Sequence, residues 1–251
     1  MSGHGSFHEL LERRDFEVRF ERVVHAFDPG RAHCFEALVT GRAGTTLERS
    51  EVLLGCVRRK GAQVEFDRAC VRAALAAARE LPGAPRIALN VHAVTLAADF
   101  EFLSFLADTA EENWIDPERL VLEIAEDVSG WRQRGLLDSL AGLRAIGARL
   151  CLDDVGCGQS NYKMMLDCRP DYFKVGGYFV RGAAADFYRQ AVLRSILELG
   201  RRFGAHVIAE GVDSRADFRL VESLGATLVQ GSLFESGART EEEQQPFSSV
   251  A

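Results

Sequence analysis

The chain has 251 residues, of which 47% are hydrophobic and 27% are charged, and its formal net charge is −7. This length fits one α/β barrel or two small domains, and no stretch in the middle resembles a linker. The acidic balance excludes a protein that binds DNA through a basic face, whereas a small phosphate ligand stays compatible because bound metal ions reverse the local field.

The six cysteines show no metal-ligand spacing, and we interpret them as reduced, mostly buried thiols. No signal peptide and no apolar stretch long enough to cross a membrane is present. The expected location is therefore the cytoplasm, with no membrane span.

The first strands are predicted near the N-terminus. Residues 1–14 are expected to be an N-terminal extension, either a remnant of a longer chain or a connection to an upstream regulatory domain or protein. Residues 16–24 alternate like a half-exposed strand, and residues 28–31 carry a turn signal. The next apolar run ends at Glu36. No crossover helix fits between the two strands, so they are predicted to form an antiparallel hairpin.

From there on, strands and helices alternate. Short apolar runs of strand length end at Asn90, Glu123, Asp153, Lys174, Glu210 and Gln230. Helical composition is found over residues 47–59, 65–79, 99–112, 131–145, 186–203 and 214–224, and a shorter connection lies at 162–166. Together with the hairpin this gives eight strands. The predicted fold is an α/β, (β/α)8 TIM-like barrel over residues 15–236 with an antiparallel first strand, followed by a solvated, disordered tail at 237–251.

The polar residues that follow these apolar runs are expected to meet at one face of the barrel, because parallel strands end together there. Asp153 and Asp154 are adjacent and lead into a glycine-rich loop. Adjacent carboxylates repel each other and are stable only in open water or beside a cation. The alternative is an ordinary loop in which Asp154 caps a helix. The recurrence of polar residues at strand ends favours a cation site.

Seven motifs in chain order carry a resemblance to a known family. They are Glu36-Ala37-Leu38, Asn90, Glu123-Ile124-Ala125-Glu126, Asp153-Asp154-Val155-Gly156-Cys157-Gly158, Lys174-Val175, Ala209-Glu210-Gly211-Val212-Asp213 and Gln230-Gly231. From about Phe16 to about Ser236 the chain resembles the EAL-domain family of cyclic-di-GMP phosphodiesterases. The resemblance implies hydrolysis of cyclic-di-GMP to linear pGpG with Mg²⁺ or Mn²⁺, two ions being expected.

The resemblance also implies residue roles. The metal ligands would be Glu36, Asn90, Glu123, Asp153 and Asp154, with Asp153 bridging the two ions. The catalytic group would be Lys174, Glu210 and Glu126. Lys174 would orient the attacking water or stabilise the charge on phosphorus. Glu210 would be the general base or an outer ligand through water. Glu126 would anchor the glycine loop.

The substrate contacts predicted with these ligands are Leu38, Arg42, Gln230 and Asp213. The chain departs from the family pattern at Thr40, where the family has an arginine that meets a substrate phosphate, and at Gly176, where it has an aspartate. Arg42 is a candidate replacement, although a hydroxyl at position 40 does not match guanidinium geometry. The loop residues Val155 and Cys157 also differ from the family pattern. These changes affect substrate affinity and loop control and leave the predicted ligands in place.

We therefore expect an active phosphodiesterase in bacterial second-messenger signalling that binds cyclic-di-GMP and forms a homodimer. The alternative is an inactive EAL-type module that binds cyclic-di-GMP or a protein, which the changes at Thr40 and Gly176 favour. Proton abstraction beside a carboxylate, as in enolase-like barrels, is a further alternative. The adjacent aspartates Asp153 and Asp154, together with Asn90, fit a two-metal hydrolase better.

Overall fold

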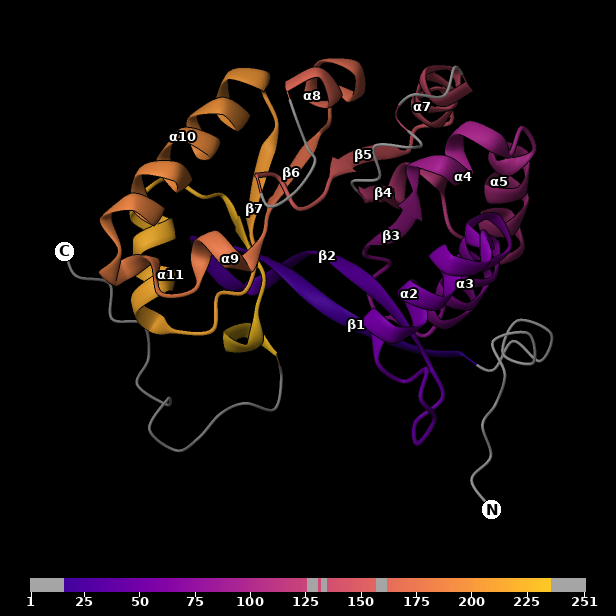
Figure 1. Ribbon diagram of the computed structural model, residues 1–251, viewed down its shortest axis with the longest axis horizontal. Coiled ribbons are helices and arrows are strands. Elements are labelled where there is room, and N and C mark those ends of the chain that lie inside the picture. Colours follow the sequence, from indigo (N-terminus) through magenta and orange to yellow (C-terminus); the bar gives the residue numbers. More distant parts are fainter. Residues whose placement is uncertain (1–15, 126–130, 132–134, 157–161, 236–251) are drawn as a thin grey trace.

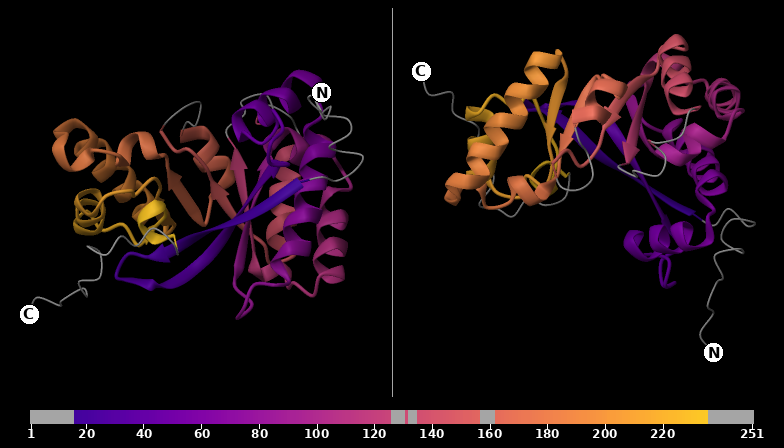
Figure 2. Two further views of the ribbon diagram at one scale, coloured as in Figure 1. Left: turned by 90° about the horizontal axis from the view of Figure 1, so that it is seen from below. Right: turned by 45° about the horizontal axis from the view of Figure 1, so that its top comes forward.

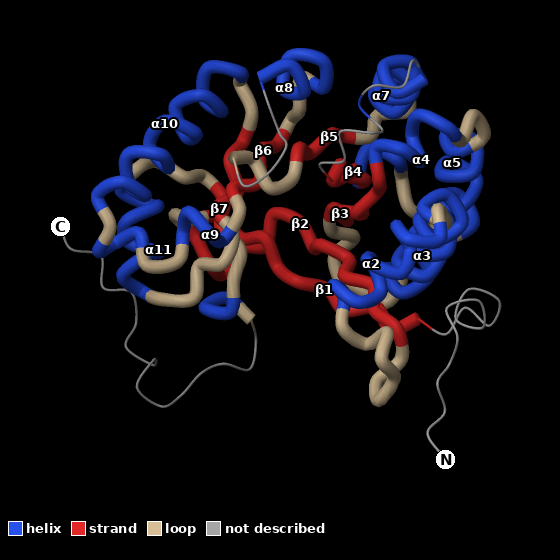
Figure 3. Tube along the Cα trace, viewed as in Figure 1, coloured by secondary structure: helices blue, strands red, loops and turns tan. Residues whose placement is uncertain are grey.

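The computed structural model describes residues 16–125, 131, 135–156 and 162–235, and in them eight strands close into a barrel in chain order. The strands lie in the centre and the helices surround them (Figures 1 and 3). The predicted TIM-like α/β barrel is confirmed. In this part of the chain no helix is both long and apolar enough to span a membrane. The predicted terminal segments lie outside the described residues, so the division into extension, barrel and tail stays a prediction.

The strands are short except in the first hairpin. They are β1 (Phe16–His25), β2 (Asp28–Gly41), β3 (Arg86–His92), β4 (Leu120–Ala125), β5 (Arg149–Leu152), β6 (Tyr172–Val175), β7 (His206–Ala209) and β8 (Leu228–Val229). The α-helices are α2 (Ser50–Lys60), α3 (Gln63–Ala78), α4 (Ala93–Ala98), α5 (Phe102–Glu112), α7 (Gly135–Ala145), α8 (Tyr162–Cys168), α9 (Gly177–Val180), α10 (Phe187–Phe203) and α11 (Arg215–Ser223). Single 3-10 turns are η1 (Pro117–Arg119), η2 (Ala183–Ala185) and η3 (Ser232–Phe234).

The first two strands form the predicted antiparallel hairpin, which extends across the molecule from the α11 side to the α2 and α3 side (Figure 2). The turn lies earlier than predicted, because His25 already pairs with Asp28. The signal at residues 28–31 instead falls at the start of β2, where proline is tolerated. β1 also pairs antiparallel with β8, through Val24–Val229 and His25–Leu228, and this pairing closes the barrel. The other neighbouring strands run parallel.

Two helices, α10 and α11, begin at side-chain caps that the sequence patterns included in the helix. The Asp186 carboxylate accepts hydrogen bonds from the Tyr188 and Arg189 amides, and the Ser214 hydroxyl accepts one from the Asp217 amide. The predictions for α10 and α11 were therefore right in place and one residue long at the start. The predicted range 47–59 begins early, because α2 starts at Ser50. The patterns missed α4 and α9, since helices of six and four residues leave almost no periodicity.

Inside the barrel, each strand contributes one side chain to a buried apolar layer. The members of this apolar layer are Val23, Cys34, Ala88, Val121, Cys151, Tyr172, Ile208 and Leu228. Successive side chains of a strand point to opposite faces. The strand residues next to each member of the apolar layer therefore point outward and pack under the helices. Gly200 of α10 permits one such contact, because a Cβ there would lie 2.3 Å from Cγ2 of Val207. Because side chains of a strand alternate, the residue two positions from each member of the apolar layer also faces the inside of the barrel.

Candidate active site

Two residues beyond the apolar layer, every strand places a polar side chain at the same level. We call this set the polar ring; its members are Glu21, Glu36, Asn90, Glu123, Asp153, Lys174, Glu210 and Gln230. The spacing follows from the two-residue period of a strand, and on the antiparallel β1 it is counted backwards, from Val23 to Glu21. Asp153, Glu210 and Gln230 come directly after their strands, as predicted. The predicted strand end is wrong for the four ring members that lie within β2, β3, β4 and β6, namely Glu36, Asn90, Glu123 and Lys174.

Lys174 lies at the centre of the polar ring. Its Nζ lies 2.7 Å from Oε2 of Glu123, 2.8 Å from Oε1 of Glu210, 3.0 Å from Oε2 of Glu36 and 3.9 Å from Oδ1 of Asp153. The side chain is only 1% exposed. Burial alone would lower the pKa of Lys174, but the surrounding carboxylates, Glu123 first, raise it well above its usual value. The lysine is therefore a fixed positive charge.

Among the carboxylates of the polar ring, Glu36 accepts the most hydrogen bonds. It accepts from Nδ2 of Asn90 at 2.9 Å and from Nε2 of Gln230 at 2.6 Å, besides the ammonium of Lys174. Burial acts to raise the pKa of Glu36, but the lysine and these hydrogen bonds outweigh it and hold the pKa at about 2. Glu36 is therefore ionised throughout the physiological pH range.

Glu123 is incompletely satisfied. It is fully buried, and its Oε1 has no hydrogen-bond partner, while Oε2 contacts Lys174. Burial, and then the charge of Glu36, raise the pKa of Glu123 well above its usual value. A buried carboxylate oxygen without a donor costs free energy, and a bound cation would remove that cost.

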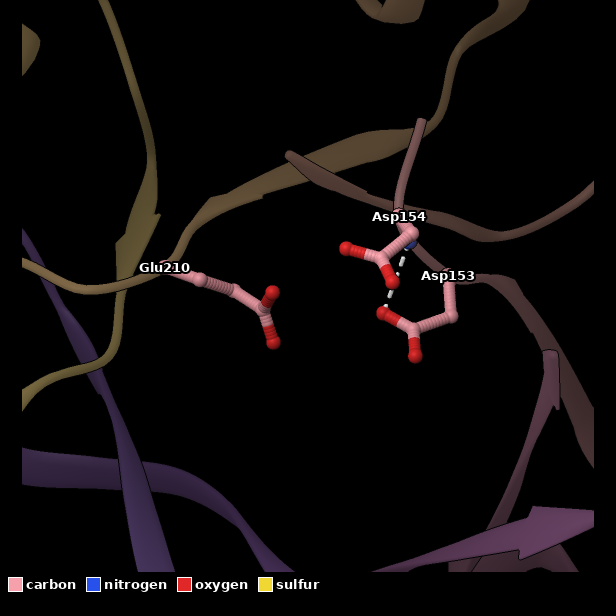
Figure 4. A group of neighbouring side chains, drawn as sticks. All are labelled: Asp153, Asp154 and Glu210. Atoms are coloured by element: carbon pink, nitrogen blue, oxygen red, sulfur yellow. Dashed lines mark hydrogen bonds between the residues drawn. The ribbon is translucent and has the colours of Figure 1, made fainter. Parts of the chain in front are cut away.

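A second group of carboxylates lies beside this centre (Figure 4). One carboxylate oxygen each of Asp153, Asp154 and Glu210 lie within 4.8 Å of one another. Glu210 extends toward the two aspartates from the β7 side, and the Asp154 amide donates to Oδ1 of Asp153 at 2.8 Å. Asp154 has a φ of 50°, a left-handed conformation that aspartate tolerates better than most residues. That bend brings two consecutive carboxylates to one side.

Burial of this carboxylate group disfavours its negative charges and raises the pKa values of two members. Burial, partly offset by Lys174 and reinforced by Asp154, raises the pKa of Asp153. Burial also raises the pKa of Glu210 to about 7, although Lys174 acts in the opposite direction. These shifts describe the protein without ions, in which mutual repulsion favours protonated carboxyl groups.

The donor set fits hard divalent cations. Every candidate atom is an oxygen, the carboxylates outnumber the single ammonium, Oε1 of Glu123 lacks a partner, and three carboxylates already converge. Mg²⁺, Mn²⁺ and Ca²⁺ all prefer such oxygen ligands. The structure thus brings together the predicted ligands Glu36, Asn90, Glu123 and Asp153, with Asp154 next to them.

The remaining predicted residues lie around the ring or outside it. Gln230 donates to Glu36 and also to Oε2 of Glu21 at 3.2 Å. Asp213 lies at the surface, bonded to Nε of Arg181 and to the amide and hydroxyl of Ser232. Three predicted residues are left: the substrate contacts Leu38 and Arg42, and the loop anchor Glu126.

Leu38 follows Glu36 on the same face of β2 and is partly buried. Arg42 comes after the end of β2, where its carbonyl accepts from the Thr45 amide at 3.2 Å. Glu126 and the loop residue Cys157 lie outside the described residues. The structure thus leaves Leu38 and Arg42 beyond the polar ring, not in it.

Sequence reasoning missed Glu21. Its carboxylate lies on β1 directly opposite Glu36 and accepts hydrogen bonds from Gln230 and from Nη2 of Arg19. The available signal was the alternation of residues 16–24, which puts Glu21 and Val23 on one face. Without the barrel, that face cannot be distinguished from a solvent-exposed one.

Comparison with known proteins gives a family match. The model of the EAL domain matches residues 5–236. Among curated proteins, the cyclic di-GMP phosphodiesterase TpdA of Vibrio parahaemolyticus is 30% identical over 47% of this chain and 21% of its own length. The cyclic di-GMP phosphodiesterase PA2567 of Pseudomonas aeruginosa is 31% identical over 62% of this chain and 26% of its own length. The chain therefore spans about a quarter or less of these relatives.

One relative has a different description, and solved structures share the fold. The blue light- and temperature-regulated antirepressor BluF of Escherichia coli is 25% identical over 61% of this chain and 38% of its own length. Klebsiella pneumoniae BlrP1 in a calcium/cy-diGMP complex is 25% identical with a TM-score of 0.78, covering 87% of this chain and 55% of that one. The PaMucR phosphodiesterase in a c-di-GMP complex has a TM-score of 0.80 at 23% identity, covering 94% and 96%.

Proposed function

Because the chain belongs to the EAL domain family, we propose that it is a metal-dependent phosphodiesterase that hydrolyses one phosphodiester bond of cyclic-di-GMP to give linear pGpG. The observation that carries the proposal is the buried cluster of Glu36, Glu123 and Glu210 around Lys174, with Asp153 beside it. A site built only to bind a nucleotide has no need for so many buried carboxylates, because they repel phosphate.

In this proposal the predicted ligands hold two ions, Mg²⁺ or Mn²⁺. Glu36, Asn90, Glu123 and Asp153 contribute to the first, and Asp153 and Asp154 to the second. Ions bound there supply positive charge for the phosphate and acidify the attacking water. The amide of Asn90 adds a ligand oxygen without adding charge, and its Nδ2 donor already orients Glu36.

Lys174 and Glu210 are proposed to stabilise the charge on the phosphate and to take up a proton, respectively. Lys174 holds three carboxylates in place and keeps positive charge beside the reacting phosphate. Glu210 accepts the proton of the attacking water as general base. Water adds to phosphorus, the bond from phosphorus to the leaving sugar oxygen breaks, and that oxygen takes up a proton. A role for Glu210 as an outer ligand through water is the alternative.

A turnover assay tests the proposal. The purified chain is mixed with cyclic-di-GMP and Mn²⁺ or Mg²⁺, with and without EDTA, and Asp153→Asn is compared with Asp138→Asn, an exposed aspartate on α7. Metal-dependent conversion to pGpG that only Asp153→Asn abolishes is the expected result. Binding of cyclic-di-GMP without turnover in every condition would contradict it.

The second candidate is a module of the same fold that binds cyclic-di-GMP or a protein without hydrolysis. Thr40 and Gly176 favour it, and the antirepressor among the relatives shows a protein of similar sequence with another description. The same assay separates the two, because a module retains binding and shows no pGpG. Together with the phosphodiesterase activity we propose that the protein forms a homodimer, is controlled by an upstream regulatory domain or protein, and is located in the cytoplasm.

A further inference from the structure

Arg19 lies on the strand that carries Glu21, one step further toward the open end of the polar ring. Residues 17, 19, 21 and 23 of β1 share the inward face, and Arg19 is paired in register with Leu38 of β2. Its Nη2 lies 2.7 Å from Oε1 of Glu21, and its side chain is 69% exposed. The guanidinium therefore stands between the buried carboxylates and solvent.

Within the two hairpin strands, one inward-facing side chain at the level of the site carries a positive charge, whereas Arg42 comes after the end of β2. Between Glu17 and Val23 and between Cys34 and Thr40, all of which the structure describes, Arg19 is the single cation on the inward face. Arg22 has the opposite parity and donates to the carbonyl of Gly30 at 3.0 Å.

Other groups near this face do not supply a charge. Lys174 is enclosed by carboxylates and is 1% exposed. Thr40, diagonally across from Arg19, provides only a hydroxyl. The Arg19 guanidinium is thus an exposed positive charge on the inward face of the hairpin, next to the polar ring.

The contact that holds Arg19 is easily exchanged. Water weakens this ion pair on the arginine side, because the Arg19 side chain is 69% exposed, while that of Glu21 is 20% exposed. Glu21 does not depend on Arg19, since Nε2 of Gln230 donates to Oε2 of Glu21 at 3.2 Å and to Glu36 at 2.6 Å. The guanidinium can thus turn from Glu21 to a phosphate while Glu21 remains hydrogen-bonded.

We propose that Arg19 binds a phosphate of the cyclic dinucleotide and supplies from β1 the guanidinium that β2 lacks at Thr40. The inference rests on the proposed function. A guanidinium presents two parallel N–H donors to phosphate oxygens, which gives both attraction and orientation. Arg19 then determines affinity for the nucleotide and has no part in holding the metal ions.

The first test measures binding apart from turnover. Affinity for cyclic-di-GMP is measured by calorimetry in Ca²⁺ for the wild type, Arg19→Gln and Arg202→Gln. Arg202 is the matched control, because it is an equally exposed arginine paired with a glutamate, Glu198, at the end of α10. A charge-assisted bidentate contact is worth about 1.5–3 kcal/mol, so Arg19→Gln should bind about 10–100-fold more weakly while Arg202→Gln binds like the wild type. Arg19→Gln should also show a weaker salt dependence of binding.

Further readouts separate this role from a purely structural one. In turnover, Arg19→Gln should raise KM with kcat within about threefold, since the contact is made in both ground and transition states. Mn²⁺ affinity without nucleotide and the thermal midpoint should not change. The double variant Arg19→Gln with Thr40→Arg returns a guanidinium to the neighbouring strand and should restore most of the binding.

Each outcome decides the matter. Arg19→Gln that binds as tightly as Arg202→Gln overturns the inference and leaves the proposed function intact. Loss of Mn²⁺ affinity or of thermal stability together with nucleotide affinity also overturns it, in favour of Arg19 as a support for Glu21. If the wild type binds no cyclic-di-GMP, the inference falls together with the proposed function.

Discussion

The apolar layer and the polar ring lie two residues apart on every strand, and different free-energy terms govern them. On β7 the pair is Ile208 and Glu210, and on β6 it is Tyr172 and Lys174. The apolar layer is neutral and closely packed, so it stabilises the barrel by excluding water. The polar ring concentrates like charges and destabilises the ion-free protein. Because the two levels are two residues apart on each strand, the same strand register places a stabilising residue in the apolar layer and a functional residue in the polar ring.

The largest expected effect follows from Lys174→Met, which keeps the length of the side chain and removes its charge. Three carboxylates then lose the ammonium that compensates them, and breaking such a buried pair typically costs about 3–5 kcal/mol. Urea denaturation in EDTA should show this loss, and added Mn²⁺ should recover part of it. Unchanged stability in EDTA would mean that the carboxylates are protonated regardless of the lysine.

Glu210→Gln should separate the two levels most clearly. Loss of a general base should lower turnover by about 100-fold or more. The folded protein holds the Glu210 proton up to a pKa of about 7 in the absence of ions, above the value of the unfolded chain. Its contribution to stability is therefore present at low pH and lost as pH rises from about 4.5 through 7. In EDTA at pH 8 the variant should be at least as stable as the wild type. Full turnover at raised Mn²⁺ would instead make Glu210 an outer ligand.

A third prediction concerns the end of the barrel below the apolar layer, where His33 Nε2 lies 2.9 Å from the hydroxyl of Tyr172. Burial, then the charge of Arg86, lower the pKa of His33 to about 4. The unfolded chain takes up this proton first, so stability is lost as pH falls from about 6.5 toward 4. His33→Gln should remove about 1–2 kcal/mol of this loss, a figure reduced for partial exposure.

The pH dependence of urea denaturation midpoints in EDTA tests this prediction. His206→Gln is the comparison variant and should have a smaller effect, because it removes an exposed imidazole whose charge is a minor cause of the lowered pKa of His33. Equal slopes in wild type and His33→Gln would contradict it. The two ends of the barrel would then not respond to pH in opposite directions, as His33 and Glu210 predict.

The smallest effect is expected from Ile208→Val in the apolar layer. Removing one buried methylene should cost about 0.5–1.5 kcal/mol. Turnover should stay within twofold, because no charge near the ring changes. A larger loss of turnover than of stability would show that packing in the apolar layer positions Glu210, and the separation of the two levels would then be incomplete.

Much of the polar ring followed from the sequence, because parallel strands buried on both faces are short apolar runs, and the polar residue that interrupts each run is visible even where the strand continues past it. Asn90, Glu123, Asp153 and Lys174 were found in this way. Glu21 was not, because β1 runs in the opposite direction and its inward residues alternate as a solvent-exposed strand does. The contacts of Lys174 with three carboxylates also needed the closed barrel, since they join residues up to 138 positions apart. The left-handed φ of Asp154 left no sequence signal beyond the glycines that follow.

The barrel is closed by one of its shortest ladders, since β8 has two residues and meets β1 at only two pairs, as few as join β5 to β6 and β7 to β8. Directly beyond this seam, Gln230 donates to Glu21 on β1 and to Glu36 on β2. Amide hydrogen exchange should therefore be faster at this seam than in the β3–β4 ladder, which has six pairs. An opening there would separate Gln230 from both glutamates. The hydrogen bonds that orient Gln230 thus depend on local opening at one two-pair ladder of the barrel.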